Sequence, residues 1–223
     1  MFKYILFDLD GTLTDPKLGI TSSVQYALRA LGIEEPSLDR LEPFIGPPLA
    51  DSFREFYGLE GERLATAIDK YRERFATQGI FENEIYPGIP QMLADLKAKD
   101  KLLAIASSKP TLFVEQILEH FEIGKYFDHV VGSNMDGTRG TKEEVVEETL
   151  RQMLTVEMTP AQKRDAVAMV GDRKFDIEGA RAHGITSVGV LFGYAPEGEL
   201  EEAGADYIVN SVRSLQVLLT LLT

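Results

Sequence analysis

The sequence has no cysteine and few residues that could hold a soft metal ion. Its 223 residues include three histidines, which show no metal-ligand spacing: His120, His129 and His183. These absences exclude disulfides, thiolate catalysis and a zinc site built on cysteine. A chain without cysteine is compatible with the cytoplasm, and we expect a cytoplasmic location.

Basic residues are scarce as well. Lys and Arg number 23 against 36 Asp and Glu, a formal net charge of -13. The phosphates of nucleic acids and of anionic membranes would repel such a chain, so we expect neither as a partner. No apolar run reaches the roughly 20 residues of a membrane span, and no signal peptide is expected. The longest run, SLQVLLTLL near the C-terminus, predicts a packed helix.

Short apolar runs recur along the chain, separated by amphipathic segments of helix length. The runs are YILF, LLAIA, HVVG, AVAMV, TSVGVL and YIVN. Continuous apolar strands that alternate with helices are typical of a parallel sheet covered on both faces. The pattern predicts an α/β fold with a doubly wound, Rossmann-like parallel sheet.

The segment between the first two of these runs contains no predicted strand. It contains helix candidates at 16–31, 48–57 and 62–78 instead. About 70 residues are too many for a plain connection. We therefore predict a helical cap at 15–84, inserted into an α/β core made of residues 1–14 and 85–223.

Two aspartates follow the first predicted strand. Asp8 and Asp10 alternate with Leu9, so their side chains point to the same side of an extended segment. Ligands collect at the carboxyl ends of strands in such sheets, and two adjacent carboxylates favour Mg²⁺. A calcium loop fits poorly because Gly11 is fourth rather than sixth in it. A simple turn followed by a cap at Asp15 is a further alternative, but it leaves Asp8 unexplained.

Two later segments could bind an anion. Ser107 ends an apolar run before a helix opened by Pro110, where a hydroxyl and amide groups could hold phosphate. The alternative is that Ser107 and Ser108 only cap this helix. Lys142 follows Thr141 in a T-x-x-E capping box, a position where the helix dipole disfavours a cation. Lys142 therefore predicts a nearby anion, unless it is a solvated surface lysine.

A last predicted strand ends in Gly171 and is followed by two more aspartates. Asp172 and Asp176 are four residues apart, so both can face one side of the next helix. Asp172 is a candidate metal ligand, with helix capping as the alternative. Asp176 is a candidate for orienting Lys142 or a metal-bound water.

These segments resemble, in order, the four motifs of the haloacid dehalogenase (HAD) superfamily of phosphohydrolases. The matching stretches are DLDGTLTD, LLAIASSKP, GTRGTKEEVVEETL and AVAMVGDRKFDIEGARAHG. The chain departs from many members in having no proline after Lys142. FIGPPL, YPGIPQMLADLK and ADYIVNSV are similar to the capped phosphoglycolate phosphatases and 5'-nucleotidase-like proteins of this superfamily.

The resemblance implies a Mg²⁺-dependent phosphomonoesterase that acts on a small phosphorylated metabolite, as a monomer or homodimer. Asp8 would attack phosphorus to form an aspartyl-phosphate, and Asp10 would serve as general acid and base. The metal would be held by the Asp8 side chain, the Asp10 carbonyl and Asp172. The implied substrate-binding residues are Gly11, Thr12, Ser107, Ser108 and Lys142.

Two other functions share these residues. A phosphosugar mutase of the same superfamily would pass the phosphoryl group to a second sugar phosphate. A phosphoacceptor switch would retain it, although receiver domains of that kind are shorter and have no such insertion. Within the cap, Lys17, Arg54 and the FIGPP loop are candidate substrate contacts.

Overall fold

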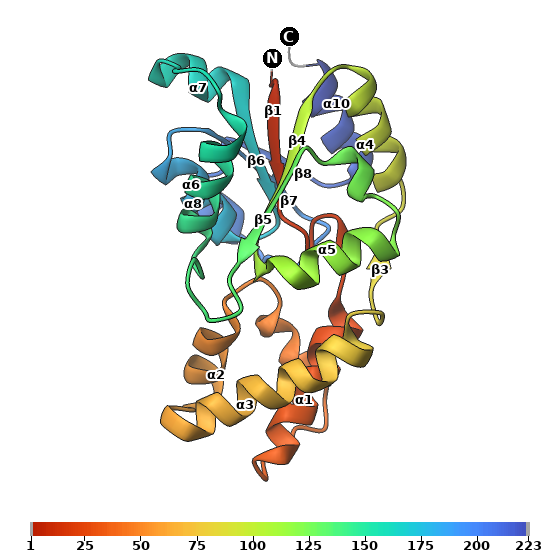
Figure 1. The fold of residues 1–223 in the computed structure, drawn as a ribbon, viewed down its shortest axis with the longest axis vertical. Coiled ribbons are helices and arrows are strands. Elements are labelled where there is room, and N and C mark those ends of the chain that lie inside the picture. The colour runs from red at the N-terminus through yellow and green to blue at the C-terminus, as the bar shows by residue number, and fades with distance from the viewer. Residues whose placement is uncertain (1, 222–223) are drawn as a thin grey trace. The chain divides into compact units, whose positions relative to one another are not determined.

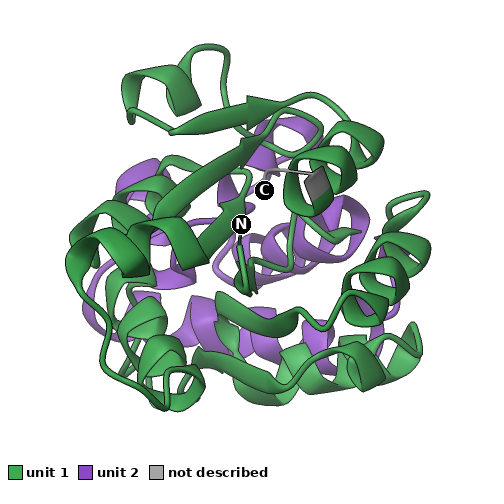
Figure 2. Cartoon of the chain, turned by 90° about the horizontal axis from the view of Figure 1, so that it is seen from above, with its two compact units in different colours: residues 1–14, 85–223 green, residues 15–84 purple. Residues whose placement is uncertain are grey.

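The computed structural model describes residues 2–221, which divide into two compact units. One unit consists of residues 1–14 and 85–223, and the other of residues 15–84 (Figure 2). The chain passes between the units through two short strands, β2 (Thr14–Asp15) and β3 (Glu84–Ile85), which pair with each other. The sequence did not predict these strands, because two residues are too few to show an apolar period.

The larger unit is built on a six-stranded parallel sheet, as predicted. Its strand order is β5-β4-β1-β6-β7-β8, with β1 near the middle (Figure 1). The strands are β1 (Tyr4–Phe7), β4 (Leu102–Pro110), β5 (His129–Ser133), β6 (Val167–Gly171), β7 (Thr186–Val190) and β8 (Tyr207–Val209). The chain moves outward from β1 to β5 and then returns to β6 on the other side. Because the winding direction reverses beside β1, a crevice is expected at the carboxyl end of that strand.

Helices cover both faces of this sheet (Figure 1). On one face lie α6 (Lys142–Met153), α7 (Pro160–Ala166) and α8 (Lys174–Ala182). On the other lie α4 (Ile89–Ala98), α5 (Thr111–His120) and α10 (Val212–Leu221). The short helices η3 (Gly124–Tyr126) and α9 (Glu199–Glu202) belong to connections. The predicted C-terminal helix is thus present as α10. No helix within residues 2–221 has both the length and the apolar content to cross a membrane.

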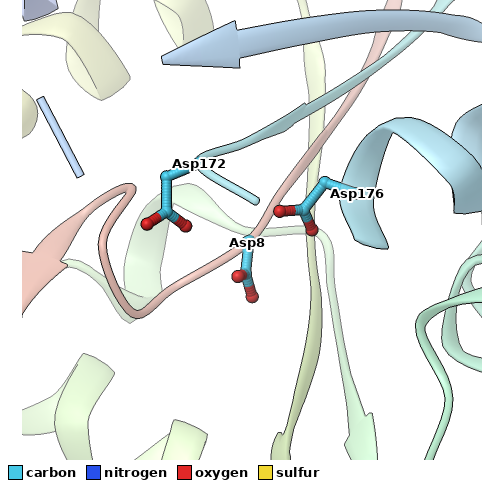
Figure 3. A group of neighbouring side chains, drawn as sticks. All are labelled: Asp8, Asp172 and Asp176. Carbon is cyan, nitrogen blue, oxygen red and sulfur yellow. The ribbon is translucent and has the colours of Figure 1, made fainter. Parts of the chain in front are cut away.

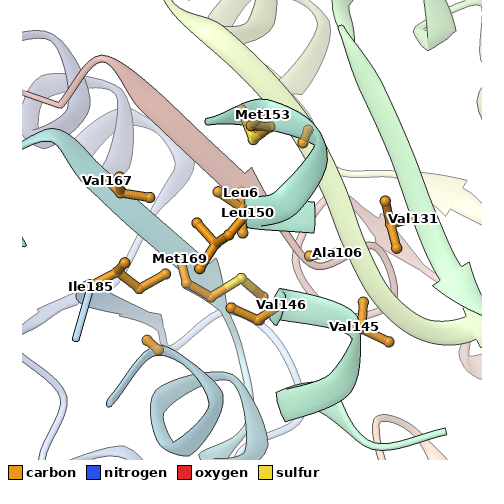
Figure 4. Close-up of a cluster of buried hydrophobic side chains, with 12 residues drawn as sticks. Leu6, Ala106, Val131, Val145, Val146, Leu150, Met153, Val167, Met169 and Ile185 are labelled. Atoms are coloured by element: carbon orange, nitrogen blue, oxygen red, sulfur yellow. The ribbon is translucent and has the colours of Figure 1, made fainter. Parts of the chain in front are cut away.

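The hydrophobic core between the sheet and helices α6 and α8 explains why the strand sequences are unbroken apolar runs. Leu6 of β1 and Met169 of β6 pack against Val146 and Leu150 of α6 (Figure 4). Ile5 and Phe7, whose side chains point to the opposite face from Leu6, are also fully buried. A strand buried on two faces has no polar alternation. This burial fixes where each strand ends and therefore where the polar residues that follow it lie.

The smaller unit is helical, and its elements lie in the three predicted helix segments except for η1, which the sequence did not predict. They are α1 (Lys17–Ala30), η1 (Asp39–Phe44), α2 (Leu49–Tyr57), α3 (Gly61–Arg74) and the π-helical turn η2 (Phe75–Gly79). The helix expected over 62–78 is therefore two elements. Arg74, at the end of α3, forms a bidentate ion pair with Glu82 at 2.8 and 2.9 Å. That pair holds the segment after the π turn against the end of α3.

Candidate active site

Four aspartates gather at the carboxyl end of the central strands of the larger unit. Phe7 of β1 is paired in register with Ile105 of β4 and Val170 of β6, so the residues after each strand emerge side by side. The four are almost completely buried: Asp8, Asp10, Asp172 and Asp176. Burial of carboxylates is costly unless cations balance them. Cations are therefore expected beside these carboxylates.

Lys142 is the cation at the centre of this group. Its Nζ lies 2.8 Å from Asp8 Oδ1 and 2.8 Å from Asp176 Oδ1. It also donates to the main-chain oxygen of Ala106 at 3.0 Å. Burial lowers the pKa of Lys142, but Asp176 and Asp8 outweigh burial and raise it. Lys142 is thus a buried ammonium, and the alternative of a solvated surface lysine is wrong.

The predicted capping box explains how a lysine comes to occupy this position. The Thr141 hydroxyl accepts from the Glu144 amide at 3.3 Å, and Glu144 accepts from the Thr141 amide at 3.1 Å. These bonds start α6 at Lys142. The helix dipole disfavours a cation in the first turn, and the two facing carboxylates offset that effect.

Asp172 has a different environment from the other three. Its Oδ2 accepts from the Tyr194 amide at 2.7 Å, and the Thr12 hydroxyl donates to its Oδ1 at 3.5 Å. Burial, followed by the charges of Asp176 and Asp8, raises the pKa of Asp172 well above its ordinary range. Asp172 does not cap α8, because the N-cap of that helix is Arg173. Arg173 in turn forms an ion pair with Glu199 at 2.8 Å.

Three of the carboxylates could hold one metal ion. Asp8, Asp172 and Asp176 each offer an oxygen, and these oxygens lie within 4.8 Å of one another (Figure 3). Four buried aspartates face two buried ammonium groups, those of Lys142 and Lys109, which leaves a formal charge of -2. An oxygen-only donor set with this charge fits a divalent hard cation. The site residues therefore fit the ion that the sequence predicted.

Asp10 does not belong to this group of three carboxylates, and its side chain contacts a different lysine. Lys109 Nζ lies 2.6 Å from Asp10 Oδ2. Burial raises the pKa of Asp10, whereas Lys109 lowers it. The Asp10 side chain is thus engaged by Lys109. That only its carbonyl would bind a metal stays a prediction. The sequence interpretation missed Lys109, although it lies two residues after Ser107 at the end of the same strand.

The turn after β1 organises the first two aspartates. The amide of Gly11 donates to the Thr14 carbonyl at 2.8 Å, and the amide of Thr12 donates to the Leu9 carbonyl at 3.2 Å. Gly11 has φ 78°, and a Cβ there would lie 2.1 Å from Asp172 Oδ2. Only glycine fits both constraints. Gly11 and Thr12 therefore shape the turn and support Asp172, and their contact with substrate stays a prediction.

The two serines in the last part of β4 do not cap a helix. β4 continues to Pro110, which is the N-cap of α5 and receives no side-chain cap bond. Ser107 is buried, and its hydroxyl accepts from the Lys109 amide at 3.4 Å. Ser108 is half-buried. The capping alternative for both serines is therefore wrong, and their role in phosphate binding stays a prediction.

The two charged residues of the helical unit that are candidate substrate contacts, Lys17 and Arg54, both form ion pairs within that unit. Lys17 forms ion pairs with Asp39 at 2.9 Å and with Glu42. Arg54 forms an exposed pair with Asp51 at 2.8 Å.

The Asp15 carboxylate accepts from the Lys17 amide at 3.0 Å, so it stabilises the start of α1 from the residue before the N-cap.

Known proteins resemble this chain over nearly its whole length. A 5'-nucleotidase from Pseudomonas aeruginosa is 46% identical over 199 residues, which are 89% of this chain and 87% of that one. A protein from Mycobacterium tuberculosis named tyrosine-protein kinase PtkA is 37% identical over 94% of this chain and 69% of its own. The crystal structure of a predicted phosphatase from Clostridium acetobutylicum matches with a TM-score of 0.90 and 45% identity over 97% of each chain.

A family model supports the same assignment. The model of the haloacid dehalogenase-like hydrolases matches residues 5–190, a range that contains all four aspartates and both lysines of the site. The resemblance inferred from the four motifs is therefore confirmed. The expectation that the protein is an enzyme of the phosphatase class is confirmed as well, because its relatives in this family are named phosphatases and a 5'-nucleotidase. The chain belongs to the haloacid dehalogenase-like hydrolases.

Proposed function

We propose that the protein is a Mg²⁺-dependent phosphomonoesterase that acts on a small phosphorylated metabolite through an aspartyl-phosphate on Asp8. The observation that carries this proposal is the buried group of four aspartates and two lysines, with its excess of two negative charges. A phosphate ester dianion would be repelled by this group unless a divalent cation joined it. Bare repulsion between two unit charges at 4 Å is about 4 kcal/mol at an effective dielectric constant of 20.

The metal would be held by the Asp8 and Asp172 side chains and the Asp10 carbonyl, with Asp176 close enough to contribute. When bound, the ion would supply charge neutralisation for the incoming phosphate. The amide of Tyr194 and the hydroxyl of Thr12 orient Asp172 for this role. Such supporting hydrogen bonds fix the direction in which a ligand oxygen points.

Asp8 is the nucleophile in this proposal. Its ion pair with Lys142 fixes the side chain, and a carboxylate needs no base to attack phosphorus. Attack forms a bond from Asp8 to phosphorus and breaks the bond to the leaving ester oxygen. Lys142 and Ser107 would stabilise the transferring phosphoryl group.

Asp10 would move the protons. Its carboxyl group would give a proton to the leaving oxygen in the first step. In the second step it would take one from the water that hydrolyses the aspartyl-phosphate. Asp10 differs from Asp8 and Asp176 because its carboxylate contacts Lys109, whereas theirs contact Lys142. That separation leaves its side chain outside the metal ligands.

Among substrates we place nucleoside 5'-monophosphates first and phosphoglycolate second. The reason is the similarity to a 5'-nucleotidase at 46% identity, whereas relatives named phosphoglycolate phosphatases are 25–30% identical. Both are small phosphorylated metabolites of the cytoplasm, where we expect the enzyme to act. The helical unit of residues 15–84 would choose between them.

The test is release of inorganic phosphate from a panel of phosphate esters, with Mg²⁺ and with EDTA. We expect Mg²⁺-dependent release from at least one nucleotide or small-acid ester. Asp165→Asn, which changes an exposed carboxylate, is the control for loss of an acidic side chain. Transfer of phosphate to a second sugar phosphate would instead indicate a mutase. No release from any ester would contradict the proposal.

A further inference from the structure

Lys109 forms the shortest lysine contact of the site, and the reaction scheme above gives it no task. Its Nζ lies 2.6 Å from Asp10 Oδ2, and the two side chains are 7% and 10% exposed. A pair this buried has lost most of its hydration, so its formation requires a compensating arrangement. A more accessible lysine pair of the same unit, Lys97 with Asp128 at 2.7 Å and with both side chains 30% exposed, carries a smaller cost.

The pair joins two neighbouring strands at the edge where the site lies. Asp10 follows β1 by three residues, and Lys109 lies in the last part of β4, beyond the point where the β4–β5 pairing loses its regular register. The β1–β4 pairing fixes Phe7 opposite Ile105. Lys109 lies between Ala106 and Pro110, which both pair with β5.

The two lysines of the site contact three of its four aspartates. Lys142 contacts Asp8 and Asp176, whereas Lys109 contacts Asp10. The carboxyl group assigned to proton transfer therefore has a cation of its own. A group that gives up a proton during the reaction becomes negatively charged at that moment. A fixed ammonium beside it stabilises that charge without rearrangement.

We propose that Lys109 is a positioning residue for Asp10: it holds the carboxyl group in place and balances the charge that Asp10 acquires when its proton moves to the ester oxygen. The proton goes from Asp10 to the leaving oxygen as the phosphorus–oxygen bond breaks and the bond to Asp8 forms. The inference rests on the proposed function. It adds a residue that affects, through Asp10, the departure of the leaving group and not the binding of the phosphoryl group.

Leaving groups of different basicity test this assignment. An alkyl alcohol leaves as an unstable alkoxide and needs the proton, whereas p-nitrophenolate leaves without one. The quantity to compare is kcat/KM, because it covers only the steps through transfer to Asp8. For Lys109→Met we expect kcat/KM on the best alkyl phosphate of the panel to fall at least tenfold, given that general acid catalysis typically contributes about 10²–10⁴-fold. On p-nitrophenyl phosphate we expect a change below about threefold.

A double-mutant comparison shows whether Lys109 acts through Asp10. Asp10→Asn removes the transferable proton, so Lys109→Met added to it should lower kcat/KM on the alkyl ester by less than about twofold. This comparison is informative even where Lys109→Met alone fails to fold, because the double variant leaves no unpaired carboxylate. Lys97→Met is the matched control and should leave both substrates unchanged.

The outcomes separate this inference from the proposed function. If the unaltered protein hydrolyses neither ester with Mg²⁺, the proposed function is wrong. If it hydrolyses both, equal losses on the two esters would mean that Lys109 binds the phosphate or supports the fold. Equal losses, no loss at all, or a further large loss in the Asp10→Asn background would each overturn the role assigned to Lys109.

Discussion

Lys142 Nζ lies 2.8 Å from Asp8 Oδ1, although the two residues are 134 positions apart in the chain. The contact joins the start of α6 to the end of β1, and both side chains are about 95% buried. An ion pair in such a place fixes the direction of the Asp8 carboxylate and reduces its repulsion of other anions.

Asp8→Asn should abolish phosphate release. The amide has no charged oxygen with which to attack phosphorus, so we expect kcat to fall at least about 10³-fold, or about 4 kcal/mol in the barrier. Folding should be preserved, because the change removes one negative charge from a group that has an excess of two. Steady-state kinetics and circular dichroism measure the two effects. Residual turnover above about 1% would contradict Asp8 as nucleophile.

Lys142→Met should destabilise the protein as well as inactivate it. The substitution leaves Asp8 and Asp176 buried without their ammonium, which typically costs about 3–5 kcal/mol. Urea unfolding in EDTA measures the loss. Adding Asp176→Asn should recover part of it, because one of the two unpaired charges is then gone. Lys97→Met, which breaks a pair whose side chains are each 30% exposed, should cost about 0–1 kcal/mol, and a similar cost for Lys142→Met would contradict the structure.

The protein without metal should lose stability as the pH rises. Burial raises the pKa of Asp10, Asp172 and Asp176 above the ordinary carboxyl range. Above about pH 4 the unfolded chain has released these protons, whereas the folded state still holds them, so the free energy of unfolding falls with increasing pH. Carboxyl groups with a lowered pKa, such as that of Glu148, are ionised in both states above about pH 5 and do not oppose this trend.

Urea unfolding in EDTA at about pH 5 and about pH 7.5 measures this slope. Mg²⁺ should reduce it, because a bound ion favours the ionised carboxylates of the folded state. At 100 times the dissociation constant the ion would add about 2.7 kcal/mol. Asp172→Asn should weaken both the slope and the effect of Mg²⁺. Stability in EDTA that is equal or greater at the higher pH would show that the carboxyl groups are balanced without a metal.

Gly11→Ala should impair the site more than its backbone strain explains. Gly11 has φ 78°, and the new Cβ would lie 2.1 Å from Asp172 Oδ2. Gly184 is the matched control, since it has φ 64° and no atom within 4 Å of a Cβ. Both substitutions should cost about 1–2 kcal/mol for the left-handed backbone. Only Gly11→Ala should also raise the Mg²⁺ concentration needed for half-maximal activity, by about tenfold or more.

Much of the fold was predictable because the sheet is buried on both faces. Each of the six predicted strands is present within one or two residues at its start, since unbroken apolar runs such as YILF can lie only in such a sheet. The sequence was less informative at element ends. β4 extends to Pro110 and the helix after Glu62 changes to a π turn at Phe75, because pairing with β5 and packing in the helical unit decide these ends.

The site was predictable where a local pattern marked it. Asp8 and Asp10 follow a buried strand, and the Thr141–Glu144 capping box places Lys142 at a helix start. Lys109 lies beside Pro110 in a segment that indicates only a loop, so no local pattern marked it. The Tyr194 amide could not be predicted either, because a main-chain donor carries no signature in the residue type.

The sequence by itself determined which residues end buried strands and start helices, because apolar periodicity and capping are local properties of the chain. Only the tertiary structure decided which cation faces which carboxylate. Lys142 forms ion pairs with Asp8 and Asp176, and Lys109 forms one with Asp10. The physical reason is that these pairs join segments more than 30 residues apart along the chain, whose separation is set by strand order and register. Charge balance in a buried site is therefore a property of the fold and not of any one motif.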